Sequence, residues 1–189
     1  YAIAHGLVGS EMCIRDSNPL TIEGKKTVSI EMWQQLGSCP DRVYVSVGDG
    51  VILSGVYKGF RDLHQLGLID KVPVIVGVQA EGSDAITRAL ETGQFDVKAS
   101  KTIADSISVD VPSNGYLAVK NLKTYQGCCV TVSDDEILKA QHELSLEFKS
   151  QSHRDQEQAA VQAVQLLLSG SSGPVSYTHL RAHETLSTR

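Results

Sequence analysis

The sequence predicts an α/β protein with three layers, in which a mostly parallel sheet has helices on both faces. Three short runs rich in valine have the character of strands: residues 43–47, residues 74–79 and residues 128–132. The segments between these runs place apolar residues three and four positions apart, which is the spacing of a helix. Strands that alternate with helices form right-handed βαβ units, and ligands of such sheets bind at the carboxyl ends of the strands.

The elements of the first half follow in order. An apolar stripe over residues 30–36 predicts a helix that ends at Gly37. VYVSV, residues 43–47, is near-alternating and predicts a strand, and the stripe over residues 53–66 predicts the next helix. Residues 74–79 form a continuous apolar run, which is typical of a strand that is covered on both faces.

Capping signals delimit the elements of the second half. Ser83 or Asp84 is expected to cap a short helix after the second strand. Residues 94–115 lack a period and predict a surface loop. Gly127 is expected to close the helix that follows this loop. SDDE, residues 133–136, is a capping box that predicts the start of a further helix.

Composition narrows the class of protein. The chain has 189 residues, of which 41% are hydrophobic, so it is long enough for one globular domain. A net charge of −5, with both signs interspersed, argues against nucleic acid or an anionic membrane surface as a partner. No apolar run approaches the roughly 18 residues that span a bilayer. The four cysteines have neither metal-ligand nor disulfide-framework spacing, so we expect a cytoplasmic protein without a bound metal.

Both ends of the chain differ from its interior. Residues 1–17 and residues 174–189 have no helical or strand period. The strings EMCIRDS and SYTHLRAHET within them resemble translated sequencing-adapter read-through. We therefore expect both ends to be non-native, and we expect the α/β domain to span residues 18–173.

A glycine-rich turn links the first strand to the next helix. In VSVGDGVILSGVYKGF, residues 45–60, two glycines flank Asp49. Glycine accepts a positive φ and lets another group approach the backbone, and unpaired N–H groups at a helix N-terminus attract phosphate. The spacing fits neither a P-loop nor a full dinucleotide fingerprint. These residues alone leave an anion site and a plain strand-to-helix turn equally open.

Five segments in order resemble one known family. They are NPLTIEGKKT, VYVSVGDGVILSGVYKGF, LGLIDKVPVIVGVQAEGSDAI, TIADSISVDVP and VTVSDDEILKAQ. In this order they resemble the threonine synthases and their relatives among the fold-type II pyridoxal-phosphate enzymes, the group that includes the tryptophan synthase β chain. The likeness covers about residues 18–140 and implies part of the large domain of such an enzyme. Residues 150–173 depart from the family pattern, which points to a local frameshift or divergence.

The resemblance implies pyridoxal 5′-phosphate as cofactor. The family binds the cofactor's phosphate through backbone N–H groups of a glycine-rich loop. The matching positions in this sequence are Gly48, Asp49, Gly50, Val51 and Ile52. Asp49 stands where relatives often have asparagine, and its carboxylate would repel a phosphate. We therefore expect the Asp49 side chain to point away from the site or to cap a backbone amide.

The resemblance also implies an activity and its alternatives. A threonine synthase converts a phosphohomoserine-type amino acid to threonine by γ-elimination and β-addition of water, and we expect the full-length enzyme to be a homodimer. A lyase of the same fold, such as threonine dehydratase or diaminopropionate ammonia-lyase, is the first alternative. A non-catalytic α/β module that binds phosphate is the second.

No residue of this chain is expected to act as a catalytic group. The resemblance implies that the Schiff-base lysine lies in an upstream segment, so we expect this chain by itself to be inactive. Lys25 and Lys26 lie in a different motif and are expected to be solvated. Glu81, Asp105 and Ser106 are the residues left open between a place in the site and a role in turns.

Overall fold

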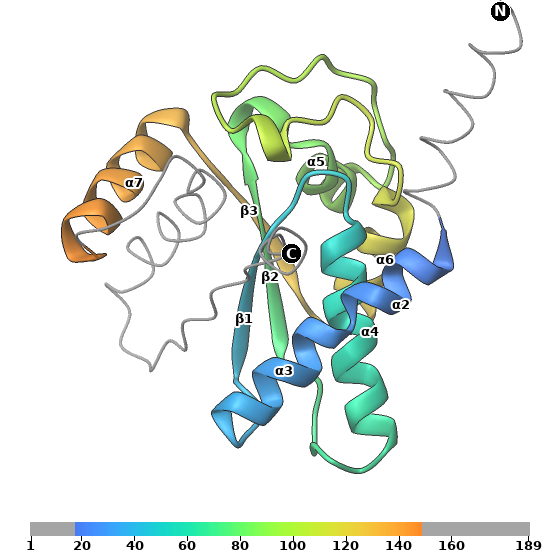
Figure 1. The fold of residues 1–189 in the computed structure, drawn as a ribbon. Coiled ribbons are helices and arrows are strands. Elements are labelled where there is room, and N and C mark those ends of the chain that lie inside the picture. Colours follow the sequence, from blue (N-terminus) through green and yellow to red (C-terminus); the bar gives the residue numbers. More distant parts are fainter. Residues whose placement is uncertain (1–17, 149–189) are drawn as a thin grey trace, which may run out of the picture.

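The structure is a computed structural model that describes residues 18–148, with side chains described to residue 143 (Figure 1). The elements in chain order are α2 (Pro19–Lys25), α3 (Thr27–Leu36), β1 (Arg42–Ser46), α4 (Val51–Gln65), β2 (Val74–Ala80), η1 (Glu81–Ser83), α5 (Ala85–Thr92), η2 (Asp105–Ile107), α6 (Gly115–Thr124), β3 (Cys128–Val132) and α7 (Asp134–Phe148). The predictions for residues 1–17 and 149–189 lie outside the described residues.

The three strands form a parallel sheet in the order β1-β2-β3. Tyr44 of β1 pairs with Val76 of β2, which pairs in turn with Cys128 of β3. Helices α2 to α6 lie on one side of this sheet and α7 lies on the other (Figure 1). The predicted class, a three-layer α/β fold with a parallel sheet, is therefore confirmed.

Two apolar cores lie on opposite faces of the sheet, because successive side chains of each strand point to opposite faces. The larger core joins α4 and α6 to one face of the sheet, and Phe60 of α4 is fully buried within it. The smaller core lies on the opposite face, where Tyr44 and Val76 pack with Ile137 of α7. Because neighbouring strand residues point to opposite faces, β2 must be apolar on both, as its continuous run predicted.

Two predicted helix ends are confirmed in detail. Gly37 follows α3 with a φ of 67° and donates its N–H to the Trp33 carbonyl. At α7, the Ser133 N–H donates to Glu136 Oε2 at 2.8 Å, and the Glu136 N–H donates to Ser133 Oγ at 3.3 Å. This reciprocal pair is a capping box. The Ser133 N–H, together with the Ser133 hydroxyl, lowers the pKa of Glu136.

The predicted cap of α5 is wrong. Asp84 occupies the N-cap position, but its side chain makes no capping hydrogen bond. Its carboxylate pairs with Arg88 and Lys98 instead, at 2.9 Å and 3.3 Å. Ser83 Oγ is also turned elsewhere, because it donates to the Ile107 carbonyl at 3.1 Å. A residue from β2, described below, supplies the missing cap.

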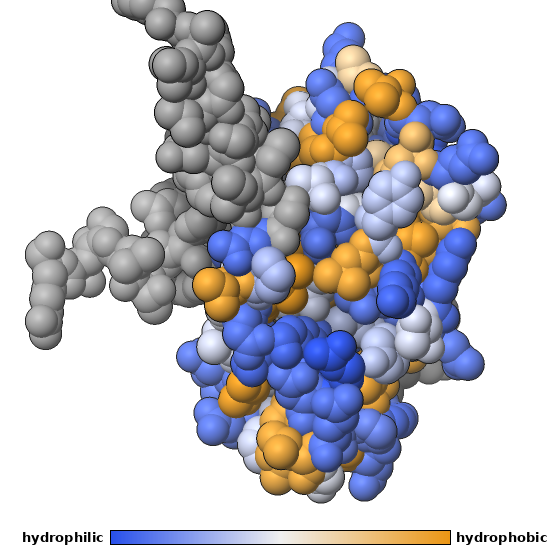
Figure 2. All heavy atoms as spheres, turned by 90° about the vertical axis from the view of Figure 1, so that its right-hand side faces the viewer, coloured by the Kyte–Doolittle hydropathy of each residue, from blue (hydrophilic) through white to orange (hydrophobic). Residues whose placement is uncertain are grey.

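The surface of the molecule carries both apolar and hydrophilic side chains (Figure 2). Figure 2 shows separate apolar patches among hydrophilic side chains on the face that it presents. Cys39, Cys128 and Cys129 are free thiols. Over residues 18–148, no helix is long and apolar enough to cross a membrane, and no cluster of three His, Cys, Asp or Glu side chains is arranged to hold a metal.

Candidate phosphate site

The glycine loop, residues 48–52, connects the carboxyl end of β1 to the start of α4. The Val47 N–H donates to the Val78 carbonyl at 2.8 Å, so the strand stays paired up to the loop. Gly50 is the N-cap of α4 and has a φ of 88°. The five predicted phosphate-site residues therefore lie where a parallel sheet places its ligands.

Gly50 needs to be glycine for two reasons that are internal to the fold. Its positive φ is a conformation that side chains with a Cβ rarely adopt. A Cβ at this position would also lie 2.8 Å from Ala118 Cβ and 3.2 Å from Ile86 Cδ1. Helix α6 therefore packs closely against the loop at Gly50, and this contact by itself requires a glycine there.

Asp49 caps the helix that follows it. Its Oδ1 accepts the Val51 N–H at 3.0 Å. The expectation that Asp49 caps a backbone amide is confirmed. The carboxylate therefore contributes one negative charge to the N-terminus of α4, where it takes one of the free donors.

Among the described residues, several N–H groups of the loop and of the first turn of α4 have no partner. Within the described part of the chain, no hydrogen bond is donated by the backbone N–H groups of Gly48, Gly50, Ile52 and Leu53. Gly50 is buried, so its unpaired N–H is costly unless a ligand or water satisfies it. Backbone donors at a helix N-terminus suit a phosphate dianion, and no lysine is needed to hold it. The donor set therefore fits the phosphate of pyridoxal 5′-phosphate.

The irregular segment predicted over residues 94–115 packs against the loop. A Cβ at Gly48 would lie 3.2 Å from both Ile107 Cα and Val109 Cγ2. Ser83 Oγ fixes this part of the segment, because it accepts the Val109 N–H at 2.9 Å. The segment is therefore one wall beside the candidate site, although its own turn, η2, was not predicted.

Two buried carboxamides at the loop were missed by the sequence analysis. Gln79 Nε2 donates to the Val47 carbonyl at 3.3 Å. Asn114 Nδ2 donates to the Gly50 carbonyl at 3.2 Å and to Ser54 Oγ at 2.7 Å. The available signals were a polar residue at the end of an apolar strand and an asparagine before a helix.

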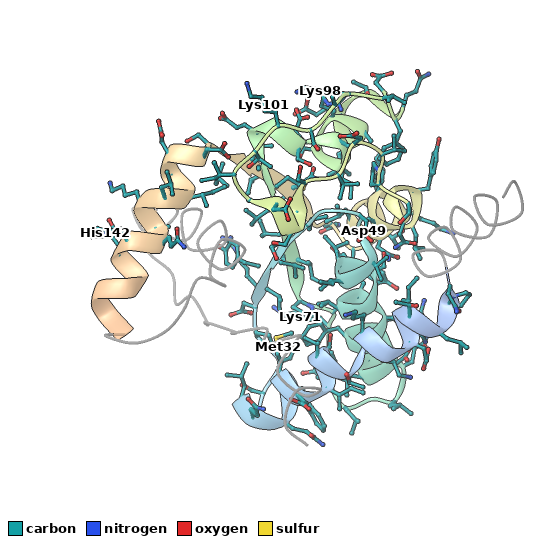
Figure 3. All side chains as sticks on the ribbon, turned by 45° about the horizontal axis from the view of Figure 1, so that its top comes forward. Met32, Asp49, Lys71, Lys98, Lys101 and His142 are labelled. Atoms are coloured by element: carbon teal, nitrogen blue, oxygen red, sulfur yellow. The ribbon has the colours of Figure 1, made fainter. Side chains whose placement is uncertain are left out.

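The other polar candidates do not join the loop. Glu81, Asp105 and Ser106 are exposed, and among the described residues their side chains make no hydrogen bond to the glycine loop. In Figure 3, Asp49 lies near the start of α4, whereas Lys98 and Lys101 lie at the periphery of the molecule. Of the candidates considered, the loop therefore offers only backbone N–H groups to a ligand.

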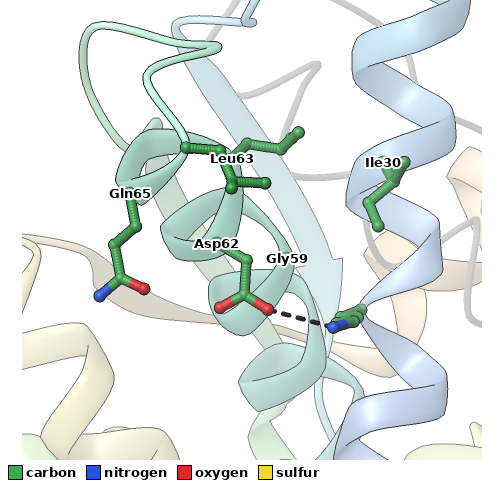
Figure 4. Close-up of a pocket in the computed structure, with 7 residues that line it drawn as sticks. Ile30, Gly59, Asp62, Leu63 and Gln65 are labelled. Atoms are coloured by element: carbon green, nitrogen blue, oxygen red, sulfur yellow. Dashed lines mark hydrogen bonds and ion pairs between the residues drawn. The ribbon is translucent and has the colours of Figure 1, made fainter.

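Lys26 is partly exposed, but it is also paired with carboxylates, which was not predicted. Its Nζ pairs with Glu23 and lies 3.2 Å from Asp62 Oδ2. Lys58 pairs with the same two carboxylates at 2.9 Å and 3.1 Å. These four residues tie α2 to α4, which lie side by side. Lys26 and Asp62 also line a groove of about 320 Å³ between α3 and the C-terminal half of α4, at the opposite end of α4 from the loop (Figure 4).

The sequence matches the family described as "Pyridoxal-phosphate dependent enzyme" over residues 10–150. The chain therefore belongs to the pyridoxal-phosphate dependent enzymes of fold type II, and the cofactor of that family is pyridoxal 5′-phosphate. The resemblance stated from the sequence is confirmed.

The known proteins that this chain resembles carry the names of different enzymes. The chain is 36% identical over 132 residues to a threonine synthase of Methanosarcina acetivorans, covering 68% of this chain and 33% of the relative. An L-serine ammonia-lyase from Rhizomucor miehei has a similar fold, with a TM-score of 0.70 and 21% identity over 82% of this chain and 48% of that chain. A threonine deaminase of T.th. has a TM-score of 0.66 at 24% identity, over 82% of this chain and 54% of that chain. The chain thus spans about a third of the length of the curated relative that it matches.

Proposed function

We propose that this chain is part of a threonine-synthase-like enzyme and that its glycine loop binds the phosphate of pyridoxal 5′-phosphate. The observation that carries the site is the set of N–H groups at Gly48, Gly50, Ile52 and Leu53 that have no partner among the described residues. When bound, the cofactor supplies an electron sink for γ-elimination from a phosphohomoserine-type amino acid and β-addition of water. The role of this chain is to hold the phosphate and thereby to position the cofactor.

The alternatives are lyases of the same fold and a non-catalytic phosphate-binding module. The 36% identity to a threonine synthase favours the synthase, because the identity to the serine ammonia-lyase and threonine deaminase structures is 21% and 24%. The homodimer, the cytoplasmic location, the domain bounds at residues 18–173 and the inactivity of the chain by itself stay predictions.

Titration of the isotope-labelled chain tests the site. We expect the amide resonances of Gly48, Gly50, Ile52 and Leu53 to shift with pyridoxal 5′-phosphate and to stay in place with pyridoxal, which lacks the phosphate. Gly93, at the far end of α5, is the internal control and should not respond. Equal shifts with both ligands, or silent loop amides, would contradict a phosphate site.

Removing the charge of Asp49 is expected to tighten the binding of the cofactor. Asp49→Asn keeps the oxygen that accepts the Val51 N–H and removes one negative charge beside the phosphate. We expect the Kd for pyridoxal 5′-phosphate to fall roughly three- to tenfold, because like charges a few ångströms apart repel. Pyridoxal affinity should not change, as equilibrium dialysis of both ligands would show.

The matched control is Asp135→Asn, which removes the same charge from an exposed residue in the first turn of α7. A gain in affinity of the same size in this control would assign the effect to net charge. Weaker binding by Asp49→Asn would mean that the carboxylate itself helps to hold the ligand.

A further inference from the structure

Gln79 is a fully buried polar residue that serves two elements at once. Its side chain is 1% exposed and lies at the carboxyl end of β2. Its Oε1 accepts the N–H groups of Ile86 and Thr87 at 3.1 Å and 2.9 Å, and this is the missing cap of α5. Its Nε2 donates to the Val47 carbonyl, the last carbonyl before the glycine loop. Oε1 also accepts from Thr87 Oγ1 at 3.1 Å and from Cys129 Sγ at 3.9 Å, and these four contacts fix which end of the carboxamide faces the loop.

Asn114 holds the loop from the other side. The side chain is 8% exposed, and it stands at the N-cap of α6 without capping that helix. Its backbone N–H donates to the Asp49 carbonyl at 3.1 Å. Its Nδ2 donates to the Gly50 carbonyl and to Ser54 Oγ. The side chain of an N-cap asparagine normally accepts a hydrogen bond from a backbone N–H of its own helix. The Asn114 side chain instead donates to the glycine loop and to α4.

Two of the three held carbonyls, those of Val47 and Asp49, belong to the same peptide units as unpaired donors. The Gly50 carbonyl shares its unit with the Val51 N–H, which Asp49 accepts. In a trans peptide the carbonyl and the following N–H point in opposite directions. A donor on the Val47 carbonyl therefore fixes the direction of the Gly48 N–H. A donor on the Asp49 carbonyl likewise fixes the direction of the Gly50 N–H. Both of these N–H groups are without a partner in the described part of the chain.

We propose that Gln79 and Asn114 are the positioning residues of the phosphate site. They do not touch the cofactor. They hold the peptide units of the glycine loop so that the Gly48 and Gly50 N–H groups face the phosphate before it binds, which removes the cost of ordering the loop. This inference rests on the proposed phosphate site.

Gln79→Glu separates the two roles of Gln79. The carboxylate keeps an oxygen for the amides of α5, and a negative charge suits that helix N-terminus. Its second oxygen replaces the donor 3.3 Å from the Val47 carbonyl, so the peptide unit is repelled instead of held. We expect pyridoxal 5′-phosphate to bind at least tenfold more weakly, with the pyridoxal affinity unchanged. The Gly48 amide resonance should move in the free protein.

Asn114→Asp applies the same change to the second carboxamide, opposite the Gly50 carbonyl. It keeps the backbone N–H on the Asp49 carbonyl, so it acts on the Gly50 N–H only by displacing residue 114. We therefore expect a smaller loss, of roughly three- to tenfold. Matched controls are Gln65→Glu and Asn121→Asp, which make the same substitutions at an exposed residue of α4 and a partly buried residue of α6. Thermal unfolding by circular dichroism monitors the fold of every variant.

Protonation provides a rescue that a packing defect would not show. In the Gln79→Glu variant, a protonated carboxyl group regains a donor toward the Val47 carbonyl. The ratio of affinities between this variant and the wild-type chain should therefore return toward one as the pH falls toward about 5. Because the two proteins are compared at the same pH, the effect of phosphate titration on the affinity cancels in this ratio. Recovery of this ratio supports orientation of the loop as the cause.

The outcomes separate this inference from the phosphate site. If the wild-type chain binds both ligands equally, the phosphate site is wrong and this inference falls with it. If the wild-type chain prefers the phosphorylated ligand and both variants keep its affinity, only the positioning role is wrong. Equal losses for the two ligands in the variants would also overturn the positioning role, because they indicate general damage to the fold.

Discussion

Gly50→Val is expected to lower the free energy of unfolding by about 4 kcal/mol or more, in the absence of any cofactor. Gly50 has a φ of 88°, which a β-branched residue adopts only under strain. A Cβ there would lie 2.8 Å from Ala118 Cβ and 3.3 Å from the Asn114 carbonyl oxygen. Since the start of α6 is held to the loop by hydrogen bonds, α6 cannot move aside without breaking them. Urea unfolding followed by circular dichroism measures the loss.

Gly93→Val is the control that isolates the overlap from the strain. Gly93 has a φ of 79°, and a Cβ there would meet nothing within 4 Å. The same substitution at Gly93 should therefore cost only the strain, on the order of 1–2 kcal/mol. Equal losses at the two positions would mean that the contact with α6 does not constrain Gly50.

This result bears on how the glycine motif is interpreted. A glycine before a helix suggests a phosphate loop, but the fold by itself requires Gly50 here. Loss of cofactor binding in a Gly50 variant therefore says little about phosphate. The direction of the unpaired N–H groups carries the functional argument, and the variants of Asp49, Gln79 and Asn114 test it without touching a glycine.

Most of the fold could be predicted because its signals are local. The strand at residues 128–132 agrees with β3, and the capping box at residues 133–136 forms as expected because its two partners are three positions apart. A strand covered on both faces is apolar throughout, so β2 was recognisable without knowledge of its neighbours. The position of the glycine loop followed from the same two elements, β1 and α4.

The residues that hold the loop could not be predicted, because their partners are distant in sequence. Gln79 reaches a carbonyl 32 positions earlier, and Asn114 reaches one 64 positions earlier. A short-range pattern assigns such residues to the nearest helix end, which is why the sequence predicts Asp84 as a cap of α5. The pair between Lys26 and Asp62 spans 36 positions and was out of reach for the same reason, whereas the second partner of Lys26, Glu23, is only three positions away.

Gly127 closes α6 as expected, because its N–H donates to the Leu122 carbonyl at 2.9 Å. The positive φ at this helix end belongs to the preceding residue, Gln126, at 56°. Gly127 is required for space instead. A Cβ there would overlap the Tyr57 hydroxyl and lie 2.6 Å from the Ile75 carbonyl oxygen. That hydroxyl is buried and has no hydrogen-bond partner in the described part of the chain.

Gly127→Ala is therefore expected to destabilise the chain by about 3 kcal/mol, because neither the β2 backbone nor the packed tyrosine can retreat. Tyr57→Phe should act in the opposite direction and stabilise the chain by roughly 1 kcal/mol, since it removes a buried polar group that lacks a partner. In the double variant the alanine methyl group meets the β2 carbonyl but no longer the hydroxyl. We expect the double variant to be about 1 kcal/mol more stable than the sum of the two single effects. Urea unfolding of the four proteins gives this coupling, and strict additivity would show that the hydroxyl does not crowd Gly127.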